Sequence, residues 1–334
     1  MPGSGIAFQV LGTGEYIPGR RVSSEEFDRR WGKPIGWTFE RTGVAERAFV
    51  AEGEDVVAMG AAAARLALDS ANIKDTELDA IIAVGSVPVQ AIPCTAVFLQ
   101  RALNLAGSGI PAFDVNATCL GFLAALDLVA QSIATGRYRT VLIVASELAS
   151  AGLNWDDSST AGLFGDGAAA VVVGVPRKDG AVLLASHLQT YSEGADFCQV
   201  RAGGTRLHPR QHPDQFLAGT FFEMSGRATY KLAAELLPGF LSTLLERSGV
   251  RARDVDVWIP HQASGLAIGH LQAALSIPAG RLVLTLETHG NQISASLPVA
   301  LHHGIASGRV RPGDVVALIG TGAGLSLGGA ILRY

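Results

Sequence analysis

The chain has 334 residues, of which 48% are hydrophobic, so it can bury a large core as two domains or as one duplicated unit. Its 26 basic and 30 acidic residues give a formal net charge of -4, which argues against nucleic acid as a main partner. The three cysteines have no metal-ligand spacing and suit a reducing cytoplasm. Residues 1–10 lack the features of a signal peptide, and the apolar run 167–175 is too short to cross a bilayer. We therefore expect a cytoplasmic protein that does not enter a membrane.

Strands and helices are expected to alternate along the first half of the chain, because apolar residues recur there with strand and helix periods in turn. The expected elements are a strand at 8–12, a helix at 54–71, a strand at 80–85, a helix at 94–103, a strand at 112–115, a helix at 121–135 and strands at 141–145 and 168–175.

The order of elements repeats after about Val175. The expected elements there are a helix at 228–248, a strand at 257–259, a helix at 265–275, a segment at 281–286, a helix at 294–306 and strands at 315–320 and 326–332. This alternation predicts an α/β fold in which the second half repeats the first.

Two short sequence matches support the repetition. Residues 71–79 resemble residues 248–256 at a shift of 177, and residues 133–137 resemble residues 305–309 at a shift of 172. Turns between helices and strands often share glycine and basic residues, but two matches in the same order favour an internal duplication. The predicted halves are residues 1–176, which carry the nucleophilic cysteine discussed next, and residues 177–334.

Cys119 lies where an apolar strand runs into a long amphipathic helix. A helix N-terminus presents unpaired N–H groups and a partial positive charge, which predicts a lowered thiol pKa and a nucleophilic cysteine. Small residues such as Asn116 and Gly121 would suit a strained, accessible turn. The alternative is a buried structural cysteine, which is what we expect of Cys94 and Cys198.

The duplication supplies possible partners for this thiol. The shift of 172 carries Cys119 to Asn291, so the same position at the start of a helix would hold a nucleophile in one half and an amide in the other. His261 follows a strand of the second half, at the C-terminal edge where open sheets usually bind ligands. We therefore expect these three side chains to meet in one cleft.

Short motifs identify a family over nearly the whole chain. They are residues 12–18, 37–43, 114–122, 163–167, 260–263, 289–291 and 322–324. In order and spacing they resemble the β-ketoacyl-acyl-carrier-protein synthase III enzymes of the thiolase superfamily. The resemblance implies a five-layer αβαβα thiolase-like fold, an obligate homodimer and no metal or other cofactor. It also implies a decarboxylative condensation of an acyl-CoA primer with malonyl-acyl-carrier protein, in fatty-acid or related biosynthesis.

The resemblance implies a role for each residue of the cleft. Cys119 would take the acyl group from the primer thioester, with its own N–H and that of Ala323 as the oxyanion hole. His261 and Asn291 would hold the thioester oxygen of the malonyl group while carbon dioxide leaves. Ile92, just before Pro93, would cross the dimer interface to form a wall of the partner's acyl pocket. The full set of implied substrate-binding residues is Trp37, Arg41, Ile92, Phe164, Met224 and Lys231.

The chain departs from the family at three positions. Ser264 stands in place of the usual Asn, and Leu266 in place of an Arg that meets the acidic carrier protein. Ser158 replaces an Arg that stacks on the adenine of coenzyme A, although Trp37 on the other side is retained. Condensing chemistry is therefore better supported than initiation of fatty-acid synthesis. A dedicated enzyme for a secondary metabolite or a cofactor precursor, such as a pimelate unit, stays open.

Two further function classes are compatible with these motifs. One is an acyltransferase that delivers the acyl group to a hydroxyl or amine without forming a carbon–carbon bond. Retention of His261 and Asn291 argues against it. The other is a non-catalytic partner subunit, against which Cys119 argues strongly.

Four other patterns are given ordinary structural interpretations. The glycine run 320–324 is followed by a predicted strand, which offers no helix dipole for a phosphate. His208 and His212 have helical spacing, but a proline follows each and argues against a metal site. His302 and His303 are expected at the surface or at an interface. The arginine-rich segment 201–212 is read as a solvated loop in preference to an anion-binding mouth, from which an Arg would pair a carboxylated primer.

Overall fold

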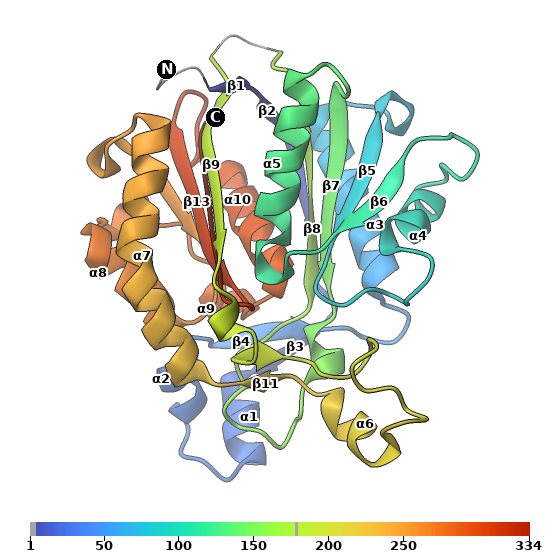
Figure 1. Cartoon of the computed structure of the whole chain (residues 1–334), viewed down its shortest axis with the longest axis vertical. Helices are drawn as coiled ribbons and strands as arrows, with labels where there is room; N and C mark the ends of the chain where they lie inside the picture. Colours follow the sequence, from blue (N-terminus) through green and yellow to red (C-terminus); the bar gives the residue numbers. More distant parts are fainter. Residues whose placement is uncertain (1–4, 178–179) are drawn as a thin grey trace.

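Two five-stranded sheets form the framework of the computed structural model, which describes residues 5–177 and 180–334 (Figure 1). Residues 1–4 of the N-terminal segment considered above lie outside the described residues. The first sheet contains, in order, β2 (Gln9–Tyr16), β8 (Gly167–Gly174), β7 (Thr140–Glu147), β5 (Ala80–Val84) and β6 (Ala112–Val115). The second contains β1 (Ile6–Ala7), β9 (Val182–Thr190), β14 (Ser326–Arg333), β13 (Val315–Gly322) and β12 (Val257–Pro260).

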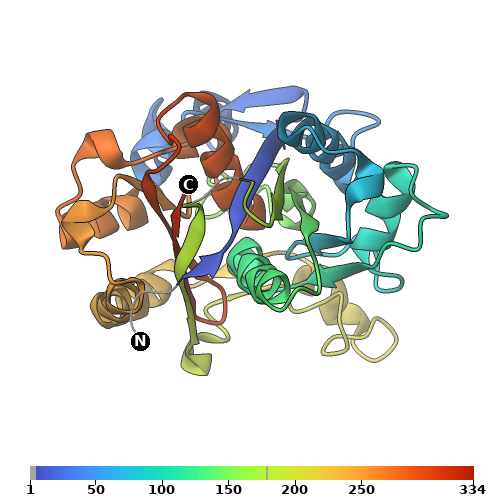
Figure 2. The same ribbon diagram turned by 90° about the horizontal axis from the view of Figure 1, so that it is seen from above.

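Helices cover both faces of both sheets. The middle layer consists of α5 (Gly121–Ala134) and α10 (Ser296–Ala306), the green and red helices near the centre of Figure 2. The outer layers are α3 (Val56–Ala71) with α4 (Thr95–Ala102), and α7 (Gly226–Ser248) with α8 (Gly265–Leu275). The predicted five-layer αβαβα arrangement is confirmed.

The strand sequences explain why the sheets are covered on both sides. In β5 every residue is buried, so its apolar run is continuous instead of alternating with polar residues. Ile82 and Val84 pack in the central core, which α5 and α10 share with both sheets, while Ile81 and Ala83 pack against α3 and α4. The central core therefore joins the two halves of the chain into one hydrophobic unit.

The two sheets repeat each other in detail. The order β2-β8-β7-β5 in the first corresponds to β9-β14-β13-β12 in the second. Asp79 and Asp256, matched in the sequence, make equivalent contacts before β5 and β12. The Asp79 carboxylate accepts the N–H of Thr140 at 2.9 Å, and the Asp256 carboxylate accepts the N–H of Val315 at 2.9 Å. Equivalent hydrogen bonds at the predicted shift are what a duplication leaves behind.

The turns that end equivalent helices also correspond. Gly136 after α5 has a φ of 73°, and Gly308 after α10 has a φ of 70°. Asn72 after α3 has a φ of 50°, and Gly249 after α7 has a φ of 68°. These left-handed residues end the helices in the same way, because each lets the chain turn back toward the next strand.

Several elements were absent from the sequence prediction. The strand β9 was missed because Ser186, His187 and Gln189 interrupt its apolar pattern. The segment 281–286 meets the second sheet by an isolated bridge between Leu282 and Trp258. The other missed helices and strands are α1 (Ser24–Arg30), α2 (Trp37–Thr42), α6 (Pro213–Gly219), α9 (Leu286–His289), β1, β3 (Arg20–Ser23), β4 (Glu46–Phe49), β10 (Cys198–Gln199) and β11 (Glu223–Met224).

Most of these short elements gather at one end of the molecule. In Figure 1, α1, α2, α6, β3, β4 and β11 lie together below the two sheets. They enclose a separate apolar cluster that includes Phe27, Phe49, Leu163 and Phe164. Among the described residues, no helix combines the length and the apolar character that a membrane crossing requires.

Candidate active site

Cys119 lies in a strained turn between β6 and α5. The side-chain oxygen of Asn116 accepts the N–H of Thr118 at 2.9 Å, and Thr118 has a left-handed φ of 50°. A 3₁₀ turn, Thr118–Leu120, then leads directly into α5. A β-branched residue in this backbone region is costly, so the surrounding structure must hold the turn in place.

The start of α10 repeats this turn. The side-chain oxygen of Asn291 accepts the N–H of Ile293 at 2.8 Å, and Ile293 has a φ of 52°. A 3₁₀ turn, Ile293–Ala295, leads into the helix. The two turns pack against each other across the middle layer.

The repeated turn corrects the predicted equivalence of Cys119 and Asn291. The structure matches Asn291 with Asn116, and Ser294 with Cys119, at a shift of 175. The predicted shift of 172 applies only after the helices, because α10 has 11 residues and α5 has 14. Asn291 therefore lies three residues before Ser294, the residue that corresponds to Cys119.

The carboxamide of Asn291 is fixed as a hydrogen-bond donor. Its oxygen accepts the N–H of Ile293, while its Nδ2 donates to the carbonyl of Ala263 at 3.3 Å. The backbone of Asn291 is also held on both sides. Its N–H donates to Leu163 at 2.9 Å, and its carbonyl accepts from Gly165 at 3.1 Å. One hydrogen of the amide nitrogen is left for a ligand.

His261 follows β12 and is neutral at ordinary pH. The backbone N–H of His261 donates to the carbonyl of Ile319 at 2.7 Å. Burial lowers the pKa of its side chain to about 4. The neighbouring strand reaches it through Gly320. A Cβ at Gly320 would lie 2.9 Å from the Cβ of His261 and 2.9 Å from Leu120. Glycine therefore allows His261 to approach the turn that carries Cys119.

The backbone N–H groups of Cys119 and Ala323 both favour the thiolate form of Cys119. Burial nevertheless raises the pKa of the thiol to about 12, and the nearby charges of Glu147 and Cys198 add to the rise. The prediction of a lowered pKa is therefore wrong for the free protein. The helix start is present, but desolvation of the thiolate outweighs its effect. Cys198, expected to be purely structural, lies close enough to influence the thiol.

Glu147, which the sequence analysis missed, lies buried beside this turn at the end of β7. Its Oε1 accepts the hydroxyl of Ser294 at 2.6 Å and the N–H of Ser86 at 2.8 Å. Burial raises the pKa of this carboxyl to about 7. The available signal was an acid that ends an otherwise apolar strand.

Known proteins share these features. The family described as 3-oxoacyl-[acyl-carrier-protein] synthase III matches residues 113–192, and its C-terminal counterpart matches residues 245–334. The β-ketoacyl-[acyl-carrier-protein] synthase III of Aquifex aeolicus is 34% identical over 98% of this chain and 99% of the relative. That of Neisseria meningitidis FAM18 is 33% identical over the same shares, 98% and 99%. The chain belongs to the β-ketoacyl-acyl-carrier-protein synthase III family. It is therefore an enzyme, a condensing acyltransferase.

Solved structures agree with the family assignment. The Aquifex aeolicus enzyme superposes with a TM-score of 0.88 at 33% identity and covers 98% of this chain and 100% of that one. FabH from Pseudomonas aeruginosa gives 0.87 at 30% identity, with 98% of each chain covered. The priming β-ketosynthase of the R1128 polyketide pathway gives 0.88 at 29% identity, covering 99% of this chain and 97% of that one.

Trp37 and Arg41, two of the expected substrate-binding residues, lie together on α2. The guanidinium of Arg41 lies 4.7 Å from the ring centre of Trp37, and the amine of Lys33 lies 5.2 Å from it. Lys33 was not predicted. Cations on an aromatic face make a surface that suits a phosphate-bearing planar ligand.

Two other expected substrate-binding residues, Phe164 and Met224, pair through their backbones with Asn291 and Cys198. Phe164 is buried, forms a bridge with Asn291 and meets Phe222 edge to face at a centroid distance of 5.2 Å. Met224 in β11 pairs with Cys198 in β10. Because the charge of Cys198 raises the pKa of Cys119, this small hairpin lies within electrostatic reach of the thiol.

The remaining two are separate from the cleft of their own chain. Lys231 is exposed on α7. Ile92 lies on the loop between β5 and α4 and is 84% exposed, and Val87 and Val89 on that loop are also exposed. An apolar loop this exposed fits the expectation that it reaches another protomer.

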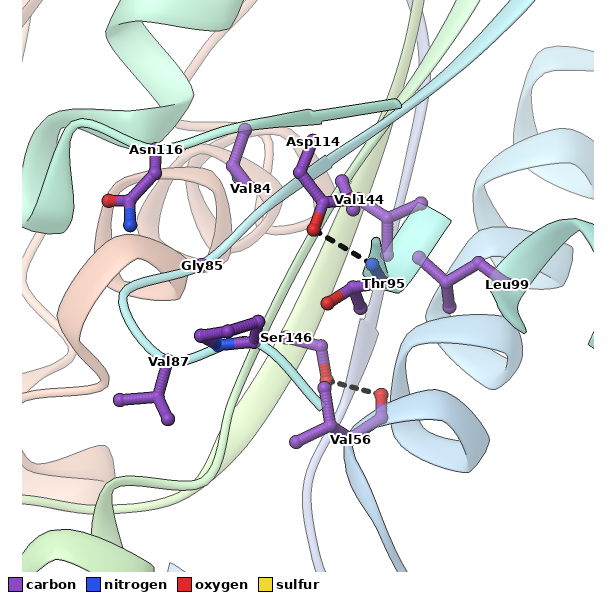
Figure 3. Close-up of a pocket in the computed structure, with 12 residues that line it drawn as sticks. Val56, Val84, Gly85, Val87, Thr95, Leu99, Asp114, Asn116, Val144 and Ser146 are labelled. Carbon is purple, nitrogen blue, oxygen red and sulfur yellow. Dashed lines mark hydrogen bonds between the residues drawn. The ribbon is translucent and has the colours of Figure 1, made fainter. Parts of the chain in front are cut away.

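A cavity of about 210 Å³ lies beside the turn, between the ends of β5, β6 and β7 and the starts of α3 and α4 (Figure 3). The carboxylate of Asp114 accepts the N–H of Thr95 at 2.8 Å, and the hydroxyl of Ser146 donates to Val56 at 2.7 Å. Asn116 lines it, but the three predicted catalytic side chains do not. The cavity therefore adjoins the cleft without containing its chemistry.

The patterns set aside in the sequence have defined places. The glycine run ends β13 and leads into β14, as predicted. In the arginine-rich loop, Arg201 binds Glu223 at 2.7 Å and Arg206 approaches Asp196 at 3.4 Å, so two of its three arginine charges are paired.

His302 and His303 differ from their prediction. Both are half-buried against β2. His302 Nδ1 lies 3.0 Å from the hydroxyl of Thr13, and His303 Nε2 lies 2.8 Å from the carboxylate of Glu15. The reason is that α10 belongs to the middle layer and packs against β2, so these two histidines are partly covered.

Proposed function

We propose that the enzyme condenses an acyl primer, supplied as acyl-CoA, with malonyl-acyl-carrier protein through an acyl-Cys119 intermediate. The observation that carries this proposal is that the backbone N–H groups of Cys119 and Ala323 both favour negative charge at the sulfur of Cys119, which lies in the turn before α5. Two N–H donors placed there suit the oxygen of a tetrahedral intermediate.

In the first half-reaction, the sulfur of Cys119 attacks the primer carbonyl. The oxygen becomes negatively charged and is held by the N–H groups of Cys119 and Ala323. The carbon–sulfur bond to coenzyme A then breaks, and the proton of Cys119 is taken up by the departing thiolate. Because the thiol is protonated at neutral pH, bringing substrate into the site must promote its deprotonation.

In the second half-reaction, His261 and Asn291 donate hydrogen bonds to the thioester oxygen of the malonyl group. Loss of carbon dioxide leaves an enolate whose charge these two neutral donors stabilise. The enolate carbon attacks the acyl-Cys119 carbonyl, and the thiolate of Cys119 leaves. The low pKa of His261 and the fixed amide of Asn291 support these roles.

Substrate binding follows from the charges around the cleft. In this proposal, Trp37 holds the adenine of coenzyme A, while Arg41 and Lys33 face its phosphates. Phe164 and Met224 border the acyl chain. Lys231 meets the acidic carrier protein, since the family's Arg is replaced here by the exposed Leu266.

The proposal includes the assembly and its setting. Two copies of the chain form a homodimer in the cytoplasm, and Ile92 of each enters the acyl pocket of the other. The duplicated halves 1–176 and 177–334 supply the nucleophile and the two donors respectively. No resident cofactor takes part, because coenzyme A and acyl-carrier protein act as substrates.

Intact-mass spectrometry tests the nucleophile. After exposure to a panel of acyl-CoAs, the wild type should gain one acyl group per chain, and Cys119→Ala should gain none while keeping its circular dichroism spectrum. A stable adduct mapped to Cys94 or Cys198 would refute the assignment. The acyl-CoA that reacts fastest identifies the primer class.

A further inference from the structure

Three side chains from distant segments meet between β2 and α10. Glu15 comes from β2, His289 from the end of α9 and His303 from near the end of α10. Glu15 Oε1 lies 3.1 Å from His289 Nε2, and Glu15 Oε2 lies 2.8 Å from His303 Nε2. One potential ligand atom from each residue lies within 4.8 Å of the other two.

This cluster is largely buried, and part of it is unsatisfied. The side chains of His289 and Glu15 are 5% and 10% exposed, while that of His303 is 38% exposed. Among the described residues, Glu15 Oε1 and His289 Nε2 have no hydrogen-bond partner. Buried polar atoms rarely lack a hydrogen-bond partner. These two atoms lie 3.1 Å apart and face each other.

The contacts of the other ring nitrogen of His289, Nδ1, explain why Glu15 Oε1 and His289 Nε2 lack a hydrogen-bond partner. Its Nδ1 lies 3.2 Å from the carbonyl of Thr285, which can only accept, and 2.8 Å from the hydroxyl of Thr288. The tautomer with a proton on Nδ1 satisfies both contacts. In the neutral imidazole this leaves a lone pair on Nε2 facing a carboxylate oxygen, an arrangement that repels unless a proton or a metal ion lies between the two atoms. Histidines that bind metals commonly donate their other N–H to a carbonyl in this way.

We propose that Glu15, His289 and His303 bind a divalent transition-metal ion, with Zn²⁺ as the preferred ion. Two imidazoles and one carboxylate are a known zinc ligand set. Tetrahedral zinc with bonds of about 2.0–2.1 Å places its ligand atoms about 3.3 Å apart. The ligand atoms here already lie within 4.8 Å of one another, so small side-chain shifts would bring them to that spacing. A water molecule completes the coordination on the half-exposed side, at His303.

The ion would tie three separate segments together. His289 is followed by Gly290, whose φ is 68°, and then by Asn291. A metal ion held by His289 therefore fastens the chain two residues before Asn291 to both β2 and α10. Because the folded chain alone assembles these ligands, binding raises Tm. This inference does not depend on the proposed condensation.

Titration of the whole metal-free protein with Zn²⁺ and Co²⁺ tests the site. Calorimetry should show one saturable Zn²⁺ site per chain, and Zn²⁺ should raise Tm. Bound Co²⁺ should give the visible absorption of a four-coordinate nitrogen and oxygen site, without a thiolate charge-transfer band. Absence of saturable binding, or a thiolate band that moves the site to a cysteine, would overturn the proposal.

Substitutions separate this site from other histidines. Glu15→Gln and His303→Gln should each weaken Zn²⁺ binding by about 100-fold or more, since loss of a second-sphere group alone typically costs 10–100-fold. His302→Gln is the matched control, because the ring nitrogen of this neighbour faces Thr13, and its only contact with the cluster among the described residues is an edge-to-face meeting with the ring of His303. Its affinity for Zn²⁺ should equal that of the wild type. Equal weakening by His302→Gln and His303→Gln would contradict the proposal, and the wild-type titration needs no variant to fold.

Discussion

Two opposing effects set the pKa of the Cys119 thiol. The start of α5 and two backbone N–H groups favour the thiolate, whereas burial and the neighbouring Glu147 and Cys198 oppose it. Burial is the largest effect, and it raises the pKa to about 12. In the free protein the nucleophile is therefore stored as a neutral thiol.

The pH dependence of Cys119 alkylation tests this point. With a pKa of about 12, the thiolate fraction should rise about tenfold for each pH unit between pH 6 and 9. Iodoacetamide labelling, resolved by peptide mapping, should therefore accelerate over this whole range at Cys119. A rate that levels off near neutral pH would show that the thiol pKa is lowered instead.

Glu147 makes a separate prediction about stability. Folding raises its carboxyl pKa from 4.5 to about 7, so the folded state holds this proton more tightly. Its contribution to stability is complete below pH 4.5 and is lost as the pH rises through about 7. The loss is worth up to about 3 kcal/mol. Glu147→Gln should remove this loss from the difference in unfolding free energy between pH 5 and pH 8.

Urea unfolding at a fixed protein concentration measures that difference. Glu52→Gln is the matched control, because Glu52 is exposed and its substitution should leave the pH dependence unchanged. If Glu147→Gln keeps the full wild-type dependence, the buried carboxyl does not carry it.

At this scale the sequence predicted positions better than properties. Cys119, His261 and Asn291 lie around the starts of α5 and α10 and the end of β12, as their places beside predicted elements implied. The pKa of Cys119 and the bond between Glu147 and Ser294 depend on burial and on residues distant in the sequence. Periodicity carries no information about either.

At the scale of elements, the starts of α5 and α10 are built alike, and in the proposed mechanism they carry the nucleophile and one of its two donors. The same side-chain turn, made by Asn116 before α5 and by Asn291 before α10, sets both 3₁₀ turns. Before α5, the 3₁₀ turn that follows Asn116 contains Cys119. Before α10, the amide of Asn291 bonds Ala263 through its nitrogen, and Ser294, at the position of Cys119, binds Glu147.

Alanine at His261 or at Asn291 should separate the two half-reactions. Removing one donor of this kind typically slows the step it serves by about 10²–10³. Loss of carbon dioxide from the malonyl thioester should fall by that factor in either variant. Self-acylation of Cys119, measured on the same sample, is the internal control and should change far less. Equal damage to both half-reactions would count against these roles.

The elements that were predicted differ in burial from those that were missed. The helix α3 was predicted closely, because its alanines form a continuous face against the first sheet. The strand β9 was missed because its burial is partial and its side chains are mixed. The shift of 172 failed at the helix starts because α10 lacks one turn relative to α5, a difference that short matches do not locate.

At the scale of the whole molecule, the loop between β5 and α4 extends apolar residues away from its own core. Ile92, at 84% exposed, is the extreme case. A dimer in which this loop enters the partner would bury it and make Ile92 a wall of the acyl pocket. An aliphatic wall leaves more room than an aromatic one.

Primer preference tests that arrangement. Short-to-medium linear, branched or carboxylated primers should acylate Cys119 at least as well as acetyl-CoA in the wild type. Ile92→Phe should shift kcat/KM toward shorter primers, whereas Val89→Phe on the same loop should not. A wild-type preference for acetyl-CoA, or no shift in Ile92→Phe, would remove Ile92 as the determinant. Carboxylated primers are the weaker case, since Arg201 and Arg206 are already paired.

The whole fold was predictable because its motifs lie in order along the chain. The duplication also helped, because the second half repeats the strand order of the first. The cluster of Glu15, His289 and His303 was not predictable. Its members come from opposite ends of the sequence and meet only after both sheets close over α10. Sequence spacing detects ligand sets that are local, and this one is not.

The central claim is condensation through acyl-Cys119, and following the isolated acyl-enzyme tests it most directly. The acylated protein is mixed with malonyl-acyl-carrier protein, and intact mass, carbon dioxide and the carrier-bound product are measured together. We predict that the acyl mass disappears from the enzyme as one carbon dioxide and one 3-oxoacyl-acyl-carrier protein appear. An acyl group that stays on the enzyme, or that moves unchanged to a hydroxyl or amine without release of carbon dioxide, would contradict the account.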